Sequence, residues 1–320
     1  MNTLKRKIHT MLHTPRIFMK KFEHSLIFPY LPDKLALQIQ YNNRFLKPLD
    51  LENPQTYNEK LQWLKLYNRH PEYTKMVDKY AVKAYVASVI GEEYIIPTYG
   101  VWEHFDDIDF QLLPEQFVLK CTHGSGDVVI CKDKRQLNLK EARIKLERSL
   151  RTDYYKISRE WPYKNVKPQI IAEKYLEDDL PVDERARESV VPEDIGLTDY
   201  KIYCFNGEAK MLLIASDRFS ERETKFDYFD KDFHRLDFDW THPRSDTIPK
   251  KPKQFDEMFA LAEKLSKDIA HVRVDFYETG GKIYFGELTF FHASGFEPFF
   301  PSEWDKKIGD WLLLPTVKTP

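Results

Sequence analysis

The chain has 320 residues, of which 42% are hydrophobic and 14% aromatic, so it can bury a large core as one large domain or two to three lobes. Its formal net charge of −2 argues against a general nucleic-acid-binding protein. The three cysteines, Cys121, Cys131 and Cys204, form no CxxC pair and no disulfide framework, which fits a reducing cytoplasm.

The N-terminal segment is basic and carries no secretion signal. Residues 1–30 hold six Lys and Arg against the single acid Glu23, and they predict a partly amphipathic helix. Such a helix either contacts the inner face of a membrane peripherally or packs on its own domain. No apolar run approaches the roughly 18 residues of a membrane-spanning helix, and charges interrupt the start of the chain. The sequence therefore predicts a cytoplasmic protein.

The next part of the chain predicts a mainly helical lobe. Its expected helices cover residues 31–45, 57–66 and 78–90. Thr56 is placed to cap the second helix, and Glu59 at its third position completes a capping box. In the third helix Lys79 and Lys83 lie four residues apart and share a face, where an anion between them would relieve their repulsion.

Residues 115–134 predict a strand, a tight loop and a second strand that resumes at Asp127. The first strand carries Lys120 near its end. The loop allows positive φ and close backbone approach, and it consists of His123, Gly124, Ser125 and Gly126. Backbone N–H groups and a lysine ammonium in this arrangement suit a phosphate. The alternative is an ordinary glycine hairpin with a solvated lysine.

The following part of the chain predicts three strands between two helices. They are expected as a helix over residues 137–150, strands over 168–178, 198–207 and 208–217, and a helix over 255–269. An Asn-Gly turn joins the second and third of these strands. Lys201 lies mid-strand among aromatic residues, where a charge is seldom buried without a partner. The polar, Pro-interrupted residues 219–253 suit a loop or a substrate-facing insertion.

The C-terminal hairpin pairs strands over residues 272–277 and 282–290 around two glycines. A symmetric two-residue turn at Thr279-Gly280 would direct Asp275 and Glu287 to opposite faces. A bulged or three-residue turn would instead bring Asp275, Glu287 and Thr289 onto one face. Oxygen ligands on adjacent strands suit Mg²⁺ carried by a nucleotide phosphate. The alternative is a charged, solvated face of a hairpin.

Six of these segments, in order, closely resemble the TupA-like branch of the ATP-grasp superfamily, which is linked to bacterial cell-surface polysaccharide biosynthesis. They are NPQTYNEKLQWLKLY, VDKYAVKAYV, FVLKCTHGSGDVVICK, IIAEKYLED, DYKIYCFNG and VRVDFYETGGKIYFGELTFFHASGFEPFFP. The resemblance covers most of residues 31–301. It implies an α+β ATP-grasp fold, with two α+β subdomains whose antiparallel sheets grip ATP, and a helical N-terminal region.

The resemblance also implies how the chain divides and which residues hold the nucleotide. The expected parts are a basic helix (1–30), a helical lobe (31–110), a subdomain with the glycine loop (111–172), a subdomain with the hinge and metal site (173–301) and a tail (302–320). Lys79 and Lys120 resemble phosphate-side lysines, and residues 123–126 the flexible loop that closes over the phosphates. Glu173, Lys174 and Leu176 match the segment that grips adenine. Asp178 and Asp179 are the candidates for the ribose-binding acid.

By the same resemblance, Arg273 and Lys201 are the catalytic cations, and Asp275 and Glu287 are the magnesium-binding carboxylates. The family's third ligand, an Asn two residues after the Glu, is replaced by Thr289, whose hydroxyl is a weaker ligand. The implied cofactors are therefore ATP and Mg²⁺, with fewer ligands for a second metal.

The expected reaction is an ATP-dependent carboxylate–amine ligation through an acyl-phosphate. The acceptor would be a carboxylate and an amine, such as a uronic-acid or amino-sugar unit of a surface polysaccharide. Three rivals remain open at this point: a kinase acting on a sugar hydroxyl, a glycosyltransferase that prefers a nucleotide-sugar, and a non-catalytic scaffold. His123 and His292 lie near the expected site and are interpreted as hydrogen-bonding or packing residues.

Overall fold

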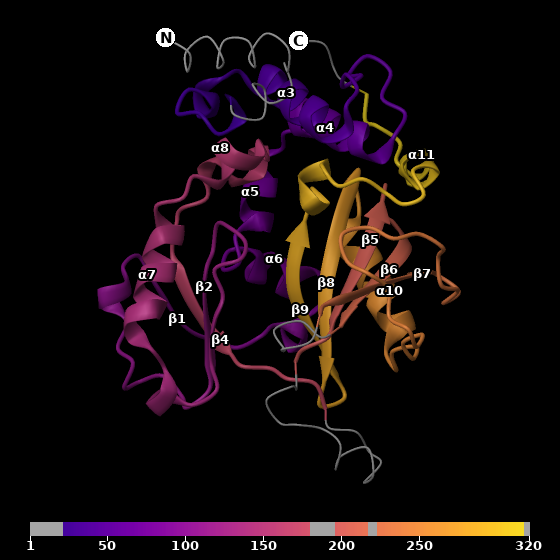
Figure 1. Ribbon diagram of the computed structural model, residues 1–320. Coiled ribbons are helices and arrows are strands. Elements are labelled where there is room, and N and C mark those ends of the chain that lie inside the picture. The colour runs from indigo at the N-terminus through magenta and orange to yellow at the C-terminus, as the bar shows by residue number, and fades with distance from the viewer. Residues whose placement is uncertain (1–21, 180–195, 217–222, 317–320) are drawn as a thin grey trace.

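The computed structural model describes residues 22–179, 196–216 and 223–316. The basic helix predicted for residues 1–30 falls mostly outside these ranges, and only its residues 22–30 are described, ending in the short turn η1 (Phe28–Tyr30). Two antiparallel sheets stand side by side, with helices over their outer faces and a group of helices across one end (Figure 1). This is the predicted α+β architecture. None of the described helices is both long and apolar enough to cross a membrane.

The first sheet has the strand order β1-β4-β2-β3, with β1 (Thr98–Trp102), β2 (Phe117–Cys121), β3 (Val129–Cys131) and β4 (Ile170–Lys174). Helix α7 (Leu139–Leu150) covers one face and buries Ala142 and Leu146 against β2 and β4. The second strand of the glycine hairpin begins at Val129 and not at the predicted Asp127. Asp127 instead turns its carboxylate back to accept a hydrogen bond from the backbone N–H of Cys121.

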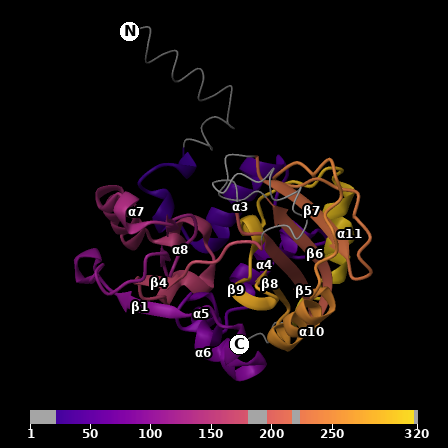
Figure 2. The ribbon, with the colours of Figure 1, turned by 90° about the horizontal axis from the view of Figure 1, so that it is seen from below.

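The second sheet has the order β7-β6-β5-β8-β9, with β5 (Asp199–Phe205), β6 (Glu208–Ser216), β7 (Lys225–Asp230), β8 (His271–Thr279) and β9 (Lys282–Thr289). Helix α10 (Phe255–Ser266) packs on it and lies on the side of the molecule opposite α7 (Figure 2). Strand β7 corrects the prediction of a loop over residues 219–253. Its four central residues, 226–229, are all buried, so no polar–apolar alternation marks the strand in the sequence.

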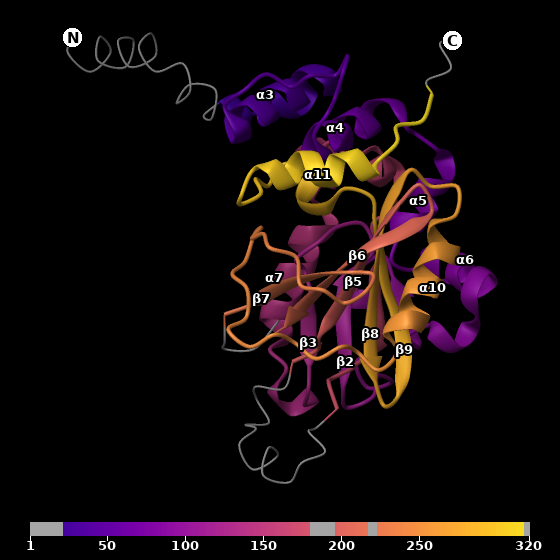
Figure 3. The same cartoon turned by 90° about the vertical axis from the view of Figure 1, so that its right-hand side faces the viewer.

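The helical end consists of α3 (Asp33–Phe45), α4 (Tyr57–Tyr67), α5 (Pro71–Val77), α6 (Val82–Ile90) and α11 (Glu303–Trp311). The predicted capping box is confirmed: the Thr56 hydroxyl accepts from the N–H of Glu59, whose carboxylate accepts from the N–H of Thr56. Helix α11, in the region predicted as a tail, lies alongside α4 (Figure 3). There the Asp305 carboxylate accepts a hydrogen bond from the N–H of Asn58.

The single helix predicted over residues 78–90 is wrong at its start. The Asp78 carboxylate accepts hydrogen bonds from the N–H groups of Tyr80 and Ala81, which ends α5 and starts a separate helix at Val82. Side-chain bonds of this kind compete with helical backbone bonds. Lys79 therefore lies in the turn, where its backbone N–H donates to the carbonyl of Thr122 and ties the helical end to the glycine loop.

The C-terminal hairpin resolves the choice left open by its sequence. Thr279 pairs with Lys282, so the turn residues are Gly280 and Gly281, both with positive φ. A bulge at Gly286 then sets Asp275 directly opposite Glu287. The two acids share a face, as the bulged alternative expected, but the turn itself has two residues and the extra residue lies within β9.

The short helical elements complete the fold. They are α8 (Tyr154–Ser158), η2 (Glu92–Tyr94), η3 (Phe105–Asp107), η4 (Lys134–Gln136), η5 (Trp161–Asn165) and η7 (His292–Gly295). The turn η7 directly follows β9 and holds Ala293 and Ser294 in the left-handed region. Two side chains of α4 secure it, because the Lys65 ammonium donates to the Ser294 carbonyl and the Gln62 amide donates to the carbonyls of Ser294 and Gly295.

Candidate functional site

A cavity of about 290 Å³ lies between the two sheets and takes its walls from both. The first sheet contributes Lys120 and Glu173, and the second contributes Lys201, Asp275 and Glu287. Its further walls come from the glycine loop and from the segment after β4, with Ser125, Gly126, Lys174, Tyr175, Leu176, Gly196 and Leu197. Most residues singled out in the sequence therefore meet in one space, although Lys79 and Glu287 lie more than 200 positions apart in the chain.

Glu173, on strand β4 of the first sheet, forms ion pairs with two lysines. Its carboxylate oxygens each lie 2.5 Å from an ammonium, one of Lys83 and one of Lys120. Lys83 reaches this carboxylate from α6 and also donates to the hydroxyl of Thr98. Burial raises the pKa of Glu173, but the two ammonium groups outweigh it and the net shift is downward, so the carboxylate is ionised. The triad carries a net positive charge that faces the cavity.

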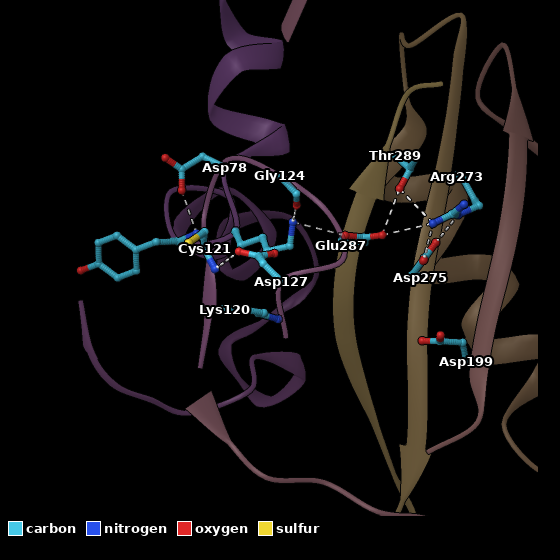
Figure 4. A network of polar contacts seen from close by, with 12 residues as sticks. Asp78, Lys120, Cys121, Gly124, Asp127, Asp199, Arg273, Asp275, Glu287 and Thr289 are labelled. Carbon is cyan, nitrogen blue, oxygen red and sulfur yellow. Dashed lines mark hydrogen bonds and ion pairs between the residues drawn. The ribbon is translucent and has the colours of Figure 1, made fainter. Parts of the chain in front are cut away.

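Arg273 is the centre of the polar network on the second sheet (Figure 4). Its Nε donates to Asp275 Oδ1 at 2.6 Å, and its Nη2 donates to Asp275 Oδ2 at 2.7 Å. The Lys201 ammonium lies 2.6 Å from the same Asp275 oxygen and 3.2 Å from Asp199. The buried charge predicted at Lys201 therefore has its partners. Burial is the largest influence on Lys201 and lowers its pKa, against the opposing effect of Asp275.

Glu287 faces the glycine loop across the space between the sheets (Figure 4). It lies 3.2 Å from Arg273 Nη2 and 3.7 Å from the ammonium of Lys79, which also donates to the carbonyl of Gly124. Burial raises the pKa of Glu287, but the positive charges of Lys79, Arg273 and the neighbouring lysines lower it to about 2. This carboxylate is ionised at every pH at which the protein would work.

Two neutral side chains complete the environment of Arg273. The Thr289 hydroxyl accepts from Arg273 Nη2 at 3.0 Å and donates to Glu287 at 3.3 Å. The Arg273 Nη1 lies 2.6 Å from Nδ1 of His292, on η7. Since a guanidinium only donates, Nδ1 must accept, and the imidazole carries its proton on Nε2. His292 thus bonds to the central arginine, and its ring packs against Trp240 at a tilt of 56°.

The glycine loop is held in place by hydrogen bonds to the end of helix α7. His123 Nε2 donates to the carbonyl of Ser149 at the end of α7, and the Ser149 hydroxyl donates to Asp127. Gly126 has a φ of 87°, which a side chain would strain. His123 itself is buried on the outer side of the loop and does not line the cavity between the sheets.

One acid in the cavity was missed by sequence reasoning. Asp178 accepts from the N–H and hydroxyl of Thr198, and Asp179 accepts from the N–H of Gly280, so both candidates for the ribose-binding acid hold loops together. Neither lines the cavity. Asp199 does, two residues before Lys201 on the same face of β5. The sequence could have indicated Asp199, because residues two apart on a strand share a face and Lys201 was already a candidate.

These residues fit a magnesium nucleotide. Carboxylate oxygens on paired strands are the hard ligands that Mg²⁺ takes, and each ionised carboxylate has more acceptor positions than its protein partners use. Asp275 is shared with Arg273 and Lys201, whereas Glu287 is half-buried and its nearer ammonium is 3.7 Å away. Lys79, Lys120 and the loop backbone lie opposite these acids, where phosphate oxygens would require positive charge.

Comparison with known families identifies the chain at this point. A family model described as TupA-like ATPgrasp matches residues 59–313, which is most of the protein. The chain belongs to the TupA-like ATP-grasp family. The matched range contains both sheets, the glycine loop and the whole acidic hairpin. A search of curated proteins found no significant match.

Several solved structures share parts of this TupA-like chain's arrangement at low similarity. The D-alanine–D-alanine ligase of Helicobacter pylori is 12% identical with a TM-score of 0.42, over 79% of this chain and 66% of that one. The Bacillus anthracis D-alanine–D-alanine ligase complexed with ATP is 13% identical with a TM-score of 0.36, over 67% and 53%. The ATP-grasp ligase PsnB complexed with minimal precursor, Mg and ADP is 12% identical with a TM-score of 0.35, over 72% and 57%. The chain thus spans between half and two thirds of their lengths.

Proposed function

We propose that this protein is an ATP- and Mg²⁺-dependent ligase that joins a carboxylate to an amine through an acyl-phosphate. The observation that carries the proposal is the meeting of Asp275 and Glu287 with Lys79 and Lys120 in one cavity between two sheets. Paired acids facing paired cations are what a metal–triphosphate needs. Membership of the ATP-grasp family supports the same reading.

In this proposal the nucleotide runs along the cavity from the segment after β4 to the glycine loop. The adenine occupies the end near Lys174 and Leu176, whose backbone follows directly on β4 and can bond to the base edge. The ribose lies near Asp199, which lines the cavity between these residues and Lys201. The phosphates lie among Lys120, Lys79 and the backbone of Ser125 and Gly126.

The proposed chemistry relies on charge placement. The substrate carboxylate attacks the terminal phosphoryl group of ATP and displaces ADP, and the guanidinium of Arg273 and the ammonium of Lys201 stabilise the charge on the transferring oxygens. Mg²⁺ held by Asp275 and Glu287 would offset the remaining phosphate charge. The amine then attacks the acyl-phosphate and releases phosphate. Thr289 orients Arg273 and Glu287 by its two hydrogen bonds and is at best a weak ligand.

The acceptor is proposed to be a sugar acid or amino sugar of a bacterial surface polysaccharide, on the strength of the family resemblance alone. Contact of residues 1–30 with the inner face of a membrane, near such a pathway, belongs to the same proposal. A sugar kinase would use the same nucleotide site, and only its products differ. A ligase releases ADP and phosphate when both carboxylate and amine are present, whereas a kinase leaves phosphate on the sugar.

Calorimetry of ATP·Mg²⁺ binding tests the proposal directly. Wild type should bind with a dissociation constant in the micromolar range, and Lys120→Ala and Asp275→Asn should each weaken binding by roughly tenfold or more, since each loses a charge-assisted contact. Lys140→Ala is the matched control, because Lys140 is an exposed residue of α7 outside the cavity. Absence of ATP binding to the wild type, with a nucleotide-sugar binding instead, would point to a glycosyltransferase.

A further inference from the structure

A second cavity, of about 340 Å³, lies on the other side of the glycine loop. Its walls are the loop itself, the last turns of α7 and the start of α8. The lining residues outside the loop are Lys145, Arg148, Ser149, Thr152 and Tyr154. The proposed nucleotide site does not use Arg148, Thr152 or Tyr154, so this space has no assigned occupant.

The two cavities meet at the phosphate end of the proposed nucleotide site. Ser125, Gly126, Asp127 and Lys145 line both of them. The Gly124 carbonyl accepts from Lys79, and a Cβ on Gly124 would lie 4.0 Å from the ring of Tyr154. The nearby carboxylates of Glu160 and Glu287 raise the pKa of the Tyr154 hydroxyl, with burial adding to the shift. Because the two cavities share these four residues, a molecule in the second cavity would lie next to the phosphate end of the proposed nucleotide site.

The cavity offers positive charge for a ligand. Arg148 is exposed and its guanidinium pairs with no carboxylate among the described residues. Lys145, one helical turn before it on α7, donates to the carbonyl of Val128 and keeps further ammonium protons. Asp127 is the one acid in the lining, and its Oδ2 accepts from the hydroxyl of Ser149 and the N–H of Cys121. The wall thus favours an anion.

We propose that the second cavity binds the acceptor, and that the acceptor carries an anionic group, carboxylate or phosphate, besides the carboxylate that reacts. The anionic group would bond to Arg148 and Lys145. The reacting carboxylate would then extend past the glycine loop toward Glu287. This inference rests on the proposed function and adds the chemical class and the place of its acceptor.

The test is calorimetric titration of the protein saturated with a non-hydrolysable ATP analogue and Mg²⁺, which keeps the probe out of the nucleotide site. The probes are D-glucuronic acid 1-phosphate, D-glucuronic acid and D-glucose 1-phosphate. We expect the first to bind most tightly, and Arg148→Gln to weaken it at least about fivefold, as loss of a charge-assisted hydrogen bond implies. The two simpler probes show whether Arg148 holds the phosphate or a carboxylate.

Arg151→Gln is the matched control, because Arg151 lies three residues along the chain, pairs with Glu147 and does not line the cavity. It should leave probe binding within about twofold of wild type, a change too small to indicate a lost contact. Binding of the ATP analogue is measured first in every variant, so failure of the nucleotide site is seen separately. If the analogue binds but no probe binds in an Arg148-dependent way, the acceptor site is refuted and the nucleotide site stands.

Discussion

At the scale of single residues, Arg273 decides how the acidic hairpin is arranged. Four side chains accept from its guanidinium, and two of them are the proposed metal carboxylates Asp275 and Glu287. A planar fork with five donors can hold such a set in fixed directions, which a lysine could not. The position of the guanidinium itself depends on His292, whose Nδ1 accepts the remaining Nη1 proton.

His292 should therefore act as a positioning residue for Arg273. Burial and the charge of Arg273 lower the pKa of His292 well below its ordinary range, so it stays neutral and able to accept. In His292→Asn the amide oxygen lies close to the place of Nδ1, whereas in His292→Gln it is displaced by one bond. We expect Asn to retain most of the turnover and Gln to lose roughly tenfold in kcat, with KM for ATP little changed.

The measurement is steady-state phosphate release, with ¹⁵N-histidine spectra to establish that the wild-type proton lies on Nε2. A residue that only fills space next to Trp240 would not distinguish Asn from Gln in this way. Equal losses in both variants, or a wild-type proton on Nδ1, would rule out the positioning role.

At the scale of elements, the bulge in β9 turns an ordinary hairpin into a candidate metal site. Without the bulge, the two-glycine turn would set Asp275 opposite Gly286 and send Glu287 to the other face. Gly286 is also close to its neighbours, because a Cβ there would lie 3.2 Å from the carbonyl oxygen of Asp275 and 3.1 Å from the ring of Tyr277.

Gly286→Ala should consequently impair the site as well as the fold. The added methyl group pushes on the backbone of Asp275, so we expect about 1–2 kcal/mol of lost stability and roughly tenfold weaker ATP·Mg²⁺ binding. Urea unfolding and calorimetry measure the two effects. The control is Ile283→Val, a buried residue of the same strand, which should cost about 1 kcal/mol and leave binding intact. Similar binding by both variants would contradict the role of the bulge.

At the scale of the whole molecule, the site exists only because two sheets and a helical turn are held together. Ile95, just before β1, forms a parallel bridge with Phe285 of β9, and the Lys79 N–H reaches the Thr122 carbonyl. The helical end is joined to the second sheet through a buried polar contact. There the Tyr57 hydroxyl donates to Nε2 of His271, whose Nδ1 donates to the carbonyl of Phe290.

This buried histidine makes the stability of the protein depend on pH. Burial lowers the pKa of His271 to about 3, so the folded protein keeps it neutral while the unfolded chain binds a proton below about pH 6.5. Stability therefore falls as the pH falls, and His271 alone should account for about 2 kcal/mol between pH 7 and pH 5. Urea unfolding at both pH values should show this difference shrinking in His271→Asn. The exposed His104, changed to Asn, serves as control and should keep the wild-type dependence.

Much of the local structure could be predicted because it rests on short-range physics. The capping box at Thr56 and Glu59, the Asn-Gly hairpin after β5 and the helix over residues 33–45 follow from side-chain bonds and turn preferences within a few residues. Similarity of motifs along the chain was also enough to indicate the family. By contrast, the helix break at Asp78 and strand β7 were missed. The break depends on side-chain bonds that compete with the helical backbone, and the burial of β7 on both faces leaves no alternating pattern in the sequence.

The sequence by itself determined which residues carry charge, most of the strands and helices, and the ATP-grasp family of the chain. Only the tertiary structure decided the register of β8 and β9, the place of Asp199 in the cavity, the structural use of Asp178 and Asp179, and the partner of His292. The physical reason is that a strand side chain's face depends on register and bulges, which one residue can reverse. A buried charge, likewise, is explained only by the partners that other segments bring to it.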